Sequence, residues 1–507
     1  MGFPLLTVLA LVPLVGSLIT FALRGNAARW SGLIFSIATL GLGVWAFIAS
    51  RGSDLSETFV WIRSIGAYYA LGDDGLTMAM VLLTVIVVPI VLLAEWRVGD
   101  DSRFAHSSES KKWSTGVFFA LALMLESFAL FCFMSVDTLL FYLFFEATLI
   151  PMYFLIGGWG GPKRGAAALK FLLYSLAGGL VMLFSVVGVG AESAAQGKVS
   201  FLVTDLAALD FDSNMGKWLW AGFFIAFAIK APMVPVHTWL PDTAEQARPG
   251  ASTLLVGILD KIGTFGMLRF CLQIFPEASR WATPLVLVLA LVSIIYGAAM
   301  AIGAKDLLRL ISYTSVSHFG FMVLGIFAFT TASISGASFY MLAHGFSTAA
   351  LFLIIGFLID RRGSADIRSF GGVQKKAPLL AGTFLVAGLS ALSLPGTASF
   401  VGEFLVLTGV WQRHPIIAAI ACLGMVLAAV YVLLAYQRTM TGPVTEQVEA
   451  TITTDLGGRE RAVAGLLIAL LLFFGFYPKP VSDVLDTSAK DTMSQIGMTD
   501  PTTGGNR

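Results

Sequence analysis

Long apolar runs separated by short polar segments recur from the start of the chain to about residue 478. A helix crosses a bilayer with roughly 20 apolar residues, so this pattern predicts about fourteen transmembrane helices. A charged loop at 95–113 separates the third span from the fourth, and a polar tail follows the last span. The predicted spans are 3–23, 30–49, 75–95, 114–134, 137–157, 166–190, 218–245, 251–274, 281–303, 306–328, 332–359, 378–411, 415–437 and 461–478.

Two of these spans, 218–245 and 378–411, contain helix-breaking residues inside an apolar run. Proline removes a backbone donor and clashes with the preceding turn, so both helices are predicted to break. A broken helix persists in lipid only where protein or a water-filled cavity surrounds it, an arrangement typical of ion pathways. The breaking residues are Pro232, Pro235 and Pro241 in the first span and Pro395 and Gly396 in the second.

The two breaks occupy corresponding places in two successive blocks of five spans. Each lies in the fourth span of its block, at 114–274 and at 281–437. Corresponding breaks predict a duplicated unit, and an odd number of helices per unit places the two copies in opposite orientations. We therefore predict an all-α polytopic membrane protein with two inverted five-helix repeats. A three-helix segment at 1–113 precedes the repeats, and 438–507 holds a loop, the last span and the polar tail.

Lys and Arg residues are distributed unevenly between the two sets of loops. If the N-terminus lies outside, the inner loops and adjoining span ends carry about twice as many of these residues as the outer ones. Cytoplasmic loops are the ones enriched in Lys and Arg. The pattern thus predicts a multi-pass protein of the bacterial inner (plasma) membrane with both termini on the outer side.

The composition excludes several classes of protein. Of the 507 residues, 57% are hydrophobic and 12% are charged, whereas a soluble domain is about 25% charged. The net charge of +1 argues against a nucleic-acid partner. No CxxC pair, Cys/His cluster, P-loop or dinucleotide-binding glycine motif is present. We therefore expect no nucleotide, metal or redox cofactor in this chain.

Ionisable residues recur within the predicted spans. One charge at the centre of a span costs about 2.5–3.5 kcal/mol, so the set would cost on the order of 15 kcal/mol if unpaired. Pairing or neutralisation must remove most of this cost. Their recurrence beside two helix breaks favours a proton path. The candidate residues are Glu126, Glu146, Lys230, Lys261, His318, His344 and Glu403.

Lys230 and Glu146 are the natural pair in this set, because a moving carboxylate would change the protonation of a buried lysine. Lys261 and the two histidines could pass a proton laterally, since histidine titrates near neutrality, and Glu403 would end the relay. The alternative is a purely structural ion pair with satisfied core histidines. Asp260 precedes Lys261 and projects about 100° away from it on a helix, toward a neighbour or a crevice.

Other polar residues have structural interpretations. Asp137 lies at the start of a span, where it is expected to cap the helix. His237 and Asp242 follow the prolines of the first break and are expected to tie the broken helix down. Lys170 is expected to extend toward the inner face of the membrane.

Four motifs make the chain similar to the antiporter-like subunits of proton-translocating NADH:quinone oxidoreductase, respiratory complex I. The resemblance covers nearly the whole chain and is strongest at 114–437. The run that begins with Lys230-Ala-Pro-Met-Val-Pro is highly specific to this superfamily. The motifs lie at 144–152, 230–242, 315–321 and 400–404.

Three sister subunits, L, M and N, share the implied fold. Glu403, where subunits L and N are expected to carry lysine, and the short segment after the last span resemble the subunit M group, the counterpart of mitochondrial chain 4. The resemblance implies that the candidate residues form the proton path. It also implies that subunits L and N are partners, and that flavin, iron–sulfur clusters and quinone bind in other subunits. Asp260 departs from the apolar residue expected before Lys261.

The function implied by this resemblance is proton pumping driven by quinone reduction in other subunits. Two alternatives share the fold: a subunit of a multisubunit sodium/proton antiporter and a subunit of a membrane-bound hydrogenase. A scaffold without transport activity is a third alternative, although it would not need the buried charges. Neighbouring genes for redox, antiporter or nickel–iron subunits would distinguish the first three.

Overall fold

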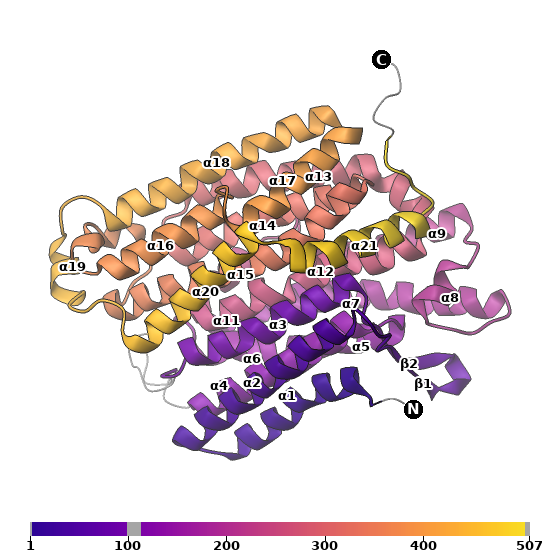
Figure 1. The fold of residues 1–507 in the computed structure, drawn as a ribbon, viewed down its shortest axis with the longest axis horizontal. Coiled ribbons are helices and arrows are strands. Elements are labelled where there is room, and N and C mark those ends of the chain that lie inside the picture. The colour runs from indigo at the N-terminus through magenta and orange to yellow at the C-terminus, as the bar shows by residue number, and fades with distance from the viewer. Residues whose placement is uncertain (1–2, 99–112, 502–507) are drawn as a thin grey trace.

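The computed structural model describes residues 3–98 and 113–501, which form a bundle of long, roughly parallel helices (Figure 1). Within these residues, ten helices are long and apolar enough to cross a membrane. They are α1 (Leu5–Ala22), α2 (Gly25–Ala49), α3 (Gly75–Ala94), α4 (Thr115–Met134), the pair α5 (Thr138–Ala147) and α6 (Leu149–Trp159), α7 (Arg164–Ala195), α13 (Pro276–Gly303), α14 (Leu307–Phe327), α15 (Thr331–Arg362) and α18 (Pro415–Met440).

The remaining predicted spans fall on interrupted helices and on the last apolar helix, so the polytopic helical fold is confirmed. Helix α9 (Ser213–Lys230) stops at the first predicted break and the chain resumes as α10 (Trp239–Gln246). The second break separates α16 (Pro378–Ala391) from α17 (Ala398–Arg413). The next element after α10 alternates between α and π geometry. It comprises α11 (Pro249–Leu254), η4 (Leu255–Leu259), α12 (Lys261–Gly266) and η5 (Met267–Leu272), and the last apolar helix is α20 (Gly458–Phe476).

The start of α1 and the end of α21 lie on the same side of the bundle, at the right of Figure 1. This placement agrees with an even number of crossings. Short helices mark the two ends of the bundle: α8 (Val203–Ala207) lies near the termini and α19 (Glu446–Thr451) lies at the opposite end. Which end faces the outside of the cell stays a prediction from the Lys and Arg distribution.

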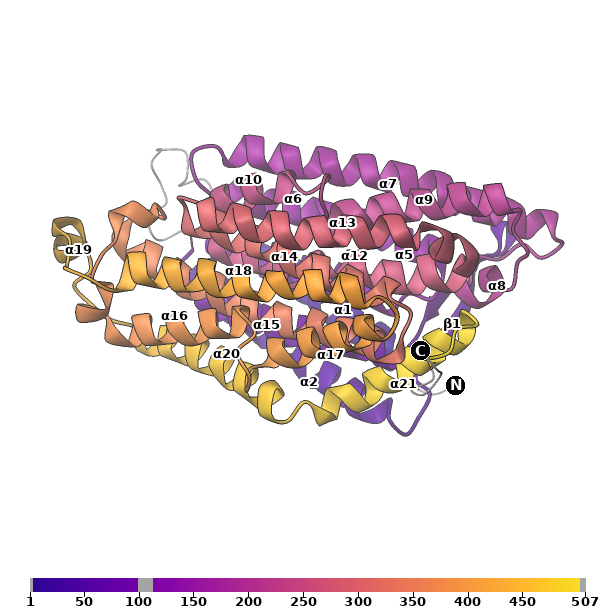
Figure 2. The same ribbon diagram turned by 90° about the horizontal axis from the view of Figure 1, so that it is seen from above.

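The central helices α14 and α15 are covered on all sides by other helices, and the apolar windows of both are fully buried. Peripheral helices are much less covered, and they present large apolar side chains such as Trp218 and Ile416 to the surroundings. A soluble protein rarely exposes so much apolar surface, whereas lipid solvates it. The polar residues of the two central helices are therefore kept away from lipid. Figure 2 shows α7 along one edge of the bundle and α21 across the opposite edge.

A short β-hairpin, which the sequence pattern did not predict, joins α2 to α3. Strand β1 (Glu57–Ile62) pairs antiparallel with β2 (Ala67–Leu71). Gly66 closes the turn with φ +67°, a conformation that costs glycine little. The hairpin lies beside the N-terminus at one end of the bundle (Figure 1), and Leu71 bridges Ser135 at the end of α4.

The segment predicted as a polar tail is instead an amphipathic helix, α21 (Lys479–Gln495), bent by 60° from α20. Val481, Leu485, Ala489 and Met493 recur at every fourth position and are buried. This spacing places them on one face, which packs against α3 and α15. Because the segment is polar on average, its single apolar stripe was not predicted from the sequence.

Replacement of Leu485 by Asp is expected to detach α21 from the bundle. The change would bury an unpaired carboxylate against α3 and α15, at a cost of about 2 kcal/mol or more. We expect faster proteolytic cleavage between α20 and α21 and a lower melting temperature of the purified protein in detergent. Thr487→Asp, on the exposed face of the same helix, is the matched control. Equal cleavage rates for both variants would contradict the packing role of the apolar stripe.

Candidate functional site

The first break is stabilised by hydrogen bonds that replace those lost from the helix. Trp239, at the start of α10, is fully buried, and its indole N–H donates to the carbonyl of Ile229 at 3.0 Å. The amide of Val234 donates to the hydroxyl of Ser293 on α13 at 3.0 Å. These bonds satisfy backbone groups that lipid could not. The break is therefore a defined structure, within which Pro235 and Thr238 remain exposed.

Lys230 is the last residue of α9 and its side chain is buried. Its Nζ atom has no hydrogen-bond partner among the described residues. Instead, Nζ lies 5.1 Å from the ring centre of Phe145 and 5.7 Å from that of Phe171. Aromatic faces attract a cation, but more weakly than a carboxylate contact would. The ammonium group is thus held without a fixed polar contact.

Glu146 lies on α5 against a glycine of α7. A Cβ atom at Gly179 would lie 1.6 Å from Oε1 of Glu146, so only glycine leaves room for the carboxyl group. Glu146 interacts electrostatically with Lys230. However, Oε1 of Glu146 has no hydrogen-bond partner, and no ion pair joins the two residues in this structure. The pairing of Lys230 with Glu146 therefore stays a prediction, supported by their electrostatic interaction and not by a direct bond in this structure.

Glu126 stands apart from the other candidates. It lies in α4 and is 1% exposed, and neither carboxyl oxygen has a hydrogen-bond partner among the described residues. Among the described residues, no hydrogen bond joins it to Lys230 or Glu146.

Lys261 is the first of a set of neighbouring buried polar side chains. Its Nζ donates to the carbonyl of Val256 at 2.6 Å and lies 2.8 Å from Nδ1 of His344 on α15. The other ring nitrogen of His344 lies 3.1 Å from the hydroxyl of Thr348. The interrupted geometry of this span, with π turns on both sides of α12, presents Lys261 to α15. Such π turns are frequent at functional sites.

The polar set continues through His318 on α14. The rings of His318 and His344 meet edge to face with centres 5.1 Å apart. Nε2 of His318 lies 3.1 Å from the hydroxyl of Tyr431 on α18. The ring of Tyr340 lies 5.9 Å from that of His318. The histidine pair thus connects Lys261 to two buried tyrosines.

Glu403 ends the set beside the second break. The hydroxyl of Tyr340 donates to Oε2 of Glu403 at 3.3 Å, and the hydroxyl of Ser393 donates to the same oxygen. Gly402 lets α17 approach α15, since a Cβ there would lie 2.7 Å from the Tyr340 backbone. Glu403 therefore follows the break as predicted and is anchored by hydroxyl groups.

The hydroxyl groups that complete this set were not predicted from the sequence. Tyr340, His344 and Thr348 follow one another at intervals of four, so they share one face of α15, and that spacing was a usable signal. Ser393 lies in the predicted break with φ +59°. No sequence pattern pointed to Tyr431, because its partner His318 lies far away in the sequence.

The structural interpretations of three other residues are supported. Asp137 caps α5, accepting from the amides of Leu139 and Leu140. Asp242 on α10 accepts from Lys170 at 2.5 Å and from Arg309 at 2.7 Å, which ties the second half of the broken helix to α7 and α14. Lys170 is thus an ion-pair partner, and its expected position near the inner face stays a prediction.

Within the described ranges, 3–98 and 113–501, no three His, Cys, Asp or Glu side chains converge as metal ligands would. The site consists of acid, base and hydroxyl groups that can bind and release protons.

Comparison with known families matches residues 135–429 to the family described as NADH:quinone oxidoreductase/Mrp antiporter, TM. The chain is 46% identical to NADH-quinone oxidoreductase subunit M of Mycobacterium tuberculosis, over 98% of this chain and 95% of that protein. It is 37% identical to subunit M of Rickettsia prowazekii, over 92% of each chain.

Two solved structures share the fold. A chain of respiratory complex I from Thermus thermophilus with bound NADH superimposes with a TM-score of 0.87 and 31% identity, over 97% of this chain and 100% of that one. A chain of the Mrp complex from Dietzia sp. has a TM-score of 0.83 and 21% identity over the same shares. At that identity, the second likeness shows the fold alone.

Replacement of Gly263 by Leu is expected to disrupt the contact between α12 and the first break. A Cβ at this position would lie 2.6 Å from the amide nitrogen of Ala231, so backbone would have to move. Overpacking of this kind costs about 1–3 kcal/mol. We expect a lower melting temperature of the purified protein. Gly382→Leu, where a Cβ meets nothing within 4 Å, is the control and should melt as the unmodified protein does.

Proposed function

The chain belongs to the NADH:quinone oxidoreductase/Mrp antiporter transmembrane family, and within it we propose that the chain is the proton-translocating subunit M of NADH:quinone oxidoreductase. The observation that carries this proposal is the buried polar set from Lys261 to Glu403. Such a set is costly in a membrane unless it transports ions. Its groups exchange protons, and none of them forms a cage for a larger ion.

In the proposed mechanism, the protonated Lys230 is the switch of the first half. Its ammonium group contacts aromatic rings but makes no hydrogen bond. A change in the charge of Glu146 therefore alters the proton affinity of Lys230 without the breaking of a hydrogen bond. Quinone reduction in other subunits would supply that change of charge. A proton released from Lys230 then passes into the second half of the chain.

In the second half, Lys261 and His344 are already in contact at 2.8 Å. Rotation of the His344 and His318 rings, which meet edge to face, carries the proton toward Tyr431 and Tyr340. Glu403 accepts it from Tyr340 and releases it beside the second break. Each hydroxyl group both donates and accepts, as a relay requires.

The oxidation and reduction steps are assigned to partner subunits, which would hold flavin, iron–sulfur clusters and the quinone site. Sister subunits L and N are the proposed membrane neighbours, since peripheral helices such as α7 and α18 present apolar faces that lipid or another subunit can cover. The complex would lie in the bacterial inner membrane with both termini of this chain outside.

A sodium/proton antiporter subunit is the second candidate, because the Mrp chain has the same fold. The sequence relatives favour the first candidate, since those at 46% and 37% identity are both subunits M. Neither observation concerns the transported ion, so a transport measurement is needed.

Replacement of Lys230 by Ala in the intact complex should lower the number of protons translocated per NADH oxidised, because the switch of the first half is removed. The measurement is acidification of vesicles that contain the purified complex, with NADH oxidation followed in the same sample. The assembled complex should still be recovered in the usual amount.

Lys217→Ala is the matched control for Lys230→Ala. Lys217 lies on the same helix, near the ring of Trp281 at the surface. An unchanged ratio of protons to NADH in Lys230→Ala would refute the proposed role. Sodium-dependent counter-transport without any redox partner would favour the antiporter instead.

Replacement of Tyr431 by Phe should slow proton pumping roughly 5- to 30-fold if the hydroxyl group relays protons from His318, since loss of a buried partner costs about 1–2 kcal/mol. The initial rate of vesicle acidification measures this effect. Tyr436→Phe, on the same helix and packed against Phe384, is the control and should pump normally. Equal rates for both variants would place Tyr431 outside the relay.

A further inference from the structure

Asp260 is a buried acid that the relay described above does not use. It lies between the π turn of η4 and the start of α12, and its exposed fraction is 0%. Neither carboxyl oxygen has a hydrogen-bond partner among the described residues. An isolated buried carboxylate is strongly unfavourable, so its presence at the centre of the bundle requires an explanation.

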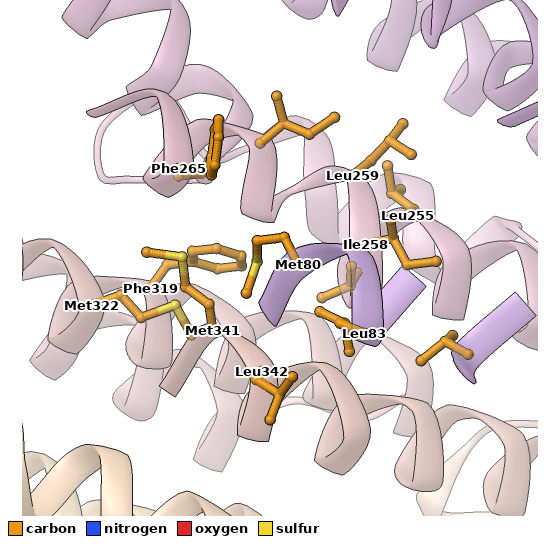
Figure 3. Packing of buried hydrophobic residues seen from close by; sticks show 14 of the residues in the cluster. Met80, Leu83, Leu255, Ile258, Leu259, Phe265, Phe319, Met322, Met341 and Leu342 are labelled. Carbon is orange, nitrogen blue, oxygen red and sulfur yellow. The ribbon is translucent and has the colours of Figure 1, made fainter. Parts of the chain in front are cut away.

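The residues close to Asp260 in sequence are mostly apolar and buried. Figure 3 shows Leu255, Ile258, Leu259 and Phe265 of this span in the same apolar cluster as Met80 of α3 and Phe319 of α14. Apolar packing therefore does not explain why an acid stands at position 260. The explanation must come from its charge or from the proton that it can bind.

The direction of Asp260 follows from the glycine one turn later. Residues three apart share one side of a helix, and a Cβ at Gly263 would lie 2.6 Å from the amide of Ala231 and 2.7 Å from the carbonyl of Phe227. These atoms belong to the end of α9, beside Lys230. Asp260 is thus turned toward the broken span that carries Lys230.

Lys261 is turned the other way. It precedes Gly263 by two residues, which is about 200° around a helix, and its ammonium group contacts His344 on α15. Adjacent residues on one helix therefore face the two halves of the proposed relay. Electrostatically, Asp260 interacts with both Lys230 and Lys261.

From this geometry we propose that Asp260 carries the proton from Lys230 to Lys261 and so joins the two halves of the path. The proposal rests on the proposed function of the chain as a proton pump. The Lys230 ammonium group transfers one proton to the Asp260 carboxylate, which leaves a neutral amine and a neutral acid. The acid then transfers that proton to the neutral amine of Lys261, after Lys261 has given its own proton to His344.

No further reactant is needed, since one proton enters at Lys230 and one leaves at His344. Because no direct bond joins Asp260 to either lysine in this structure, rotation of its side chain or a bridging water must complete each contact. The carboxyl group therefore alternates between charged and neutral forms during turnover. A fixed negative charge that only stabilises the two lysines would remain charged throughout.

The test uses the intact complex in vesicles with the variants Asp260→Asn and Asp260→Glu. Asparagine keeps the shape but cannot carry the proton, so the ratio of protons to NADH should fall to the value found for Lys230→Ala. Glutamate keeps the acid and should retain at least half of the normal ratio. Thr253→Val, a buried change on the same span in α11 away from the relay, is the control and should pump normally.

Infrared difference spectra, recorded on reduction with NADH, separate the two roles of the acid. A carrier of protons gives a band of a protonated carboxylic acid that is missing in Asp260→Asn and shifted in Asp260→Glu. If Asp260→Asn does not assemble, the shifted band in Asp260→Glu supplies the same evidence. An unshifted band there, or loss of pumping in Asp260→Asn without loss of the band, would show a fixed charge and overturn the proposal.

The failure of this inference can be told from failure of the proposed function. Normal pumping by Asp260→Asn together with impaired pumping by Lys230→Ala would refute the role of Asp260 and leave the pump assignment intact. Normal pumping by Lys230→Ala would refute the pump assignment itself.

Discussion

The ammonium group of Lys261 contacts the carbonyl of Val256 and the ring of His344. These contacts require a part of the bundle that lipid does not reach. The transfer of a charged or polar group from water to hydrocarbon costs several kcal/mol of free energy. Helices α14 and α15, which carry the histidines and Tyr340, are accordingly enclosed on all sides, while the peripheral helices α2 and α18 are only 33% buried. The division of the bundle into enclosed and peripheral helices follows from this one cost.

The same cost explains how the two breaks are tolerated. At the first, the indole of Trp239 and the hydroxyl of Ser293 take up backbone groups that the interrupted helix leaves free. At the second, α20 covers the break so closely that a Cβ at Gly475 would lie 2.2 Å from the carbonyl oxygen of Gly396. Each break is therefore held by specific contacts with neighbouring helices. Movement at either one requires displacement of these neighbours.

Much of this arrangement could be predicted from the sequence. Apolar length identified the spans, and proline and glycine located the breaks at 232 and 395, because both signals are local. The contacts of the site were less accessible. The π turns around α12, the partnership of Tyr431 with His318 and the aromatic environment of Lys230 depend on neighbours far apart in the chain. The stripe of α21 was visible every fourth residue, but the polar average of the segment obscured it.

The two halves of the proposed path differ in their hydrogen bonding. In the second half, Lys261, His344 and Glu403 have hydrogen-bonded neighbours, and a proton entering there meets a prepared series of donors and acceptors. In the first half, Lys230 and Glu146 are close but not bonded. A group without fixed partners responds more to a distant change of charge than one held by hydrogen bonds, because less must be broken. We therefore expect the first half to control transport and the second half to conduct the proton. Helix α12 lies between the two halves, and both depend on it.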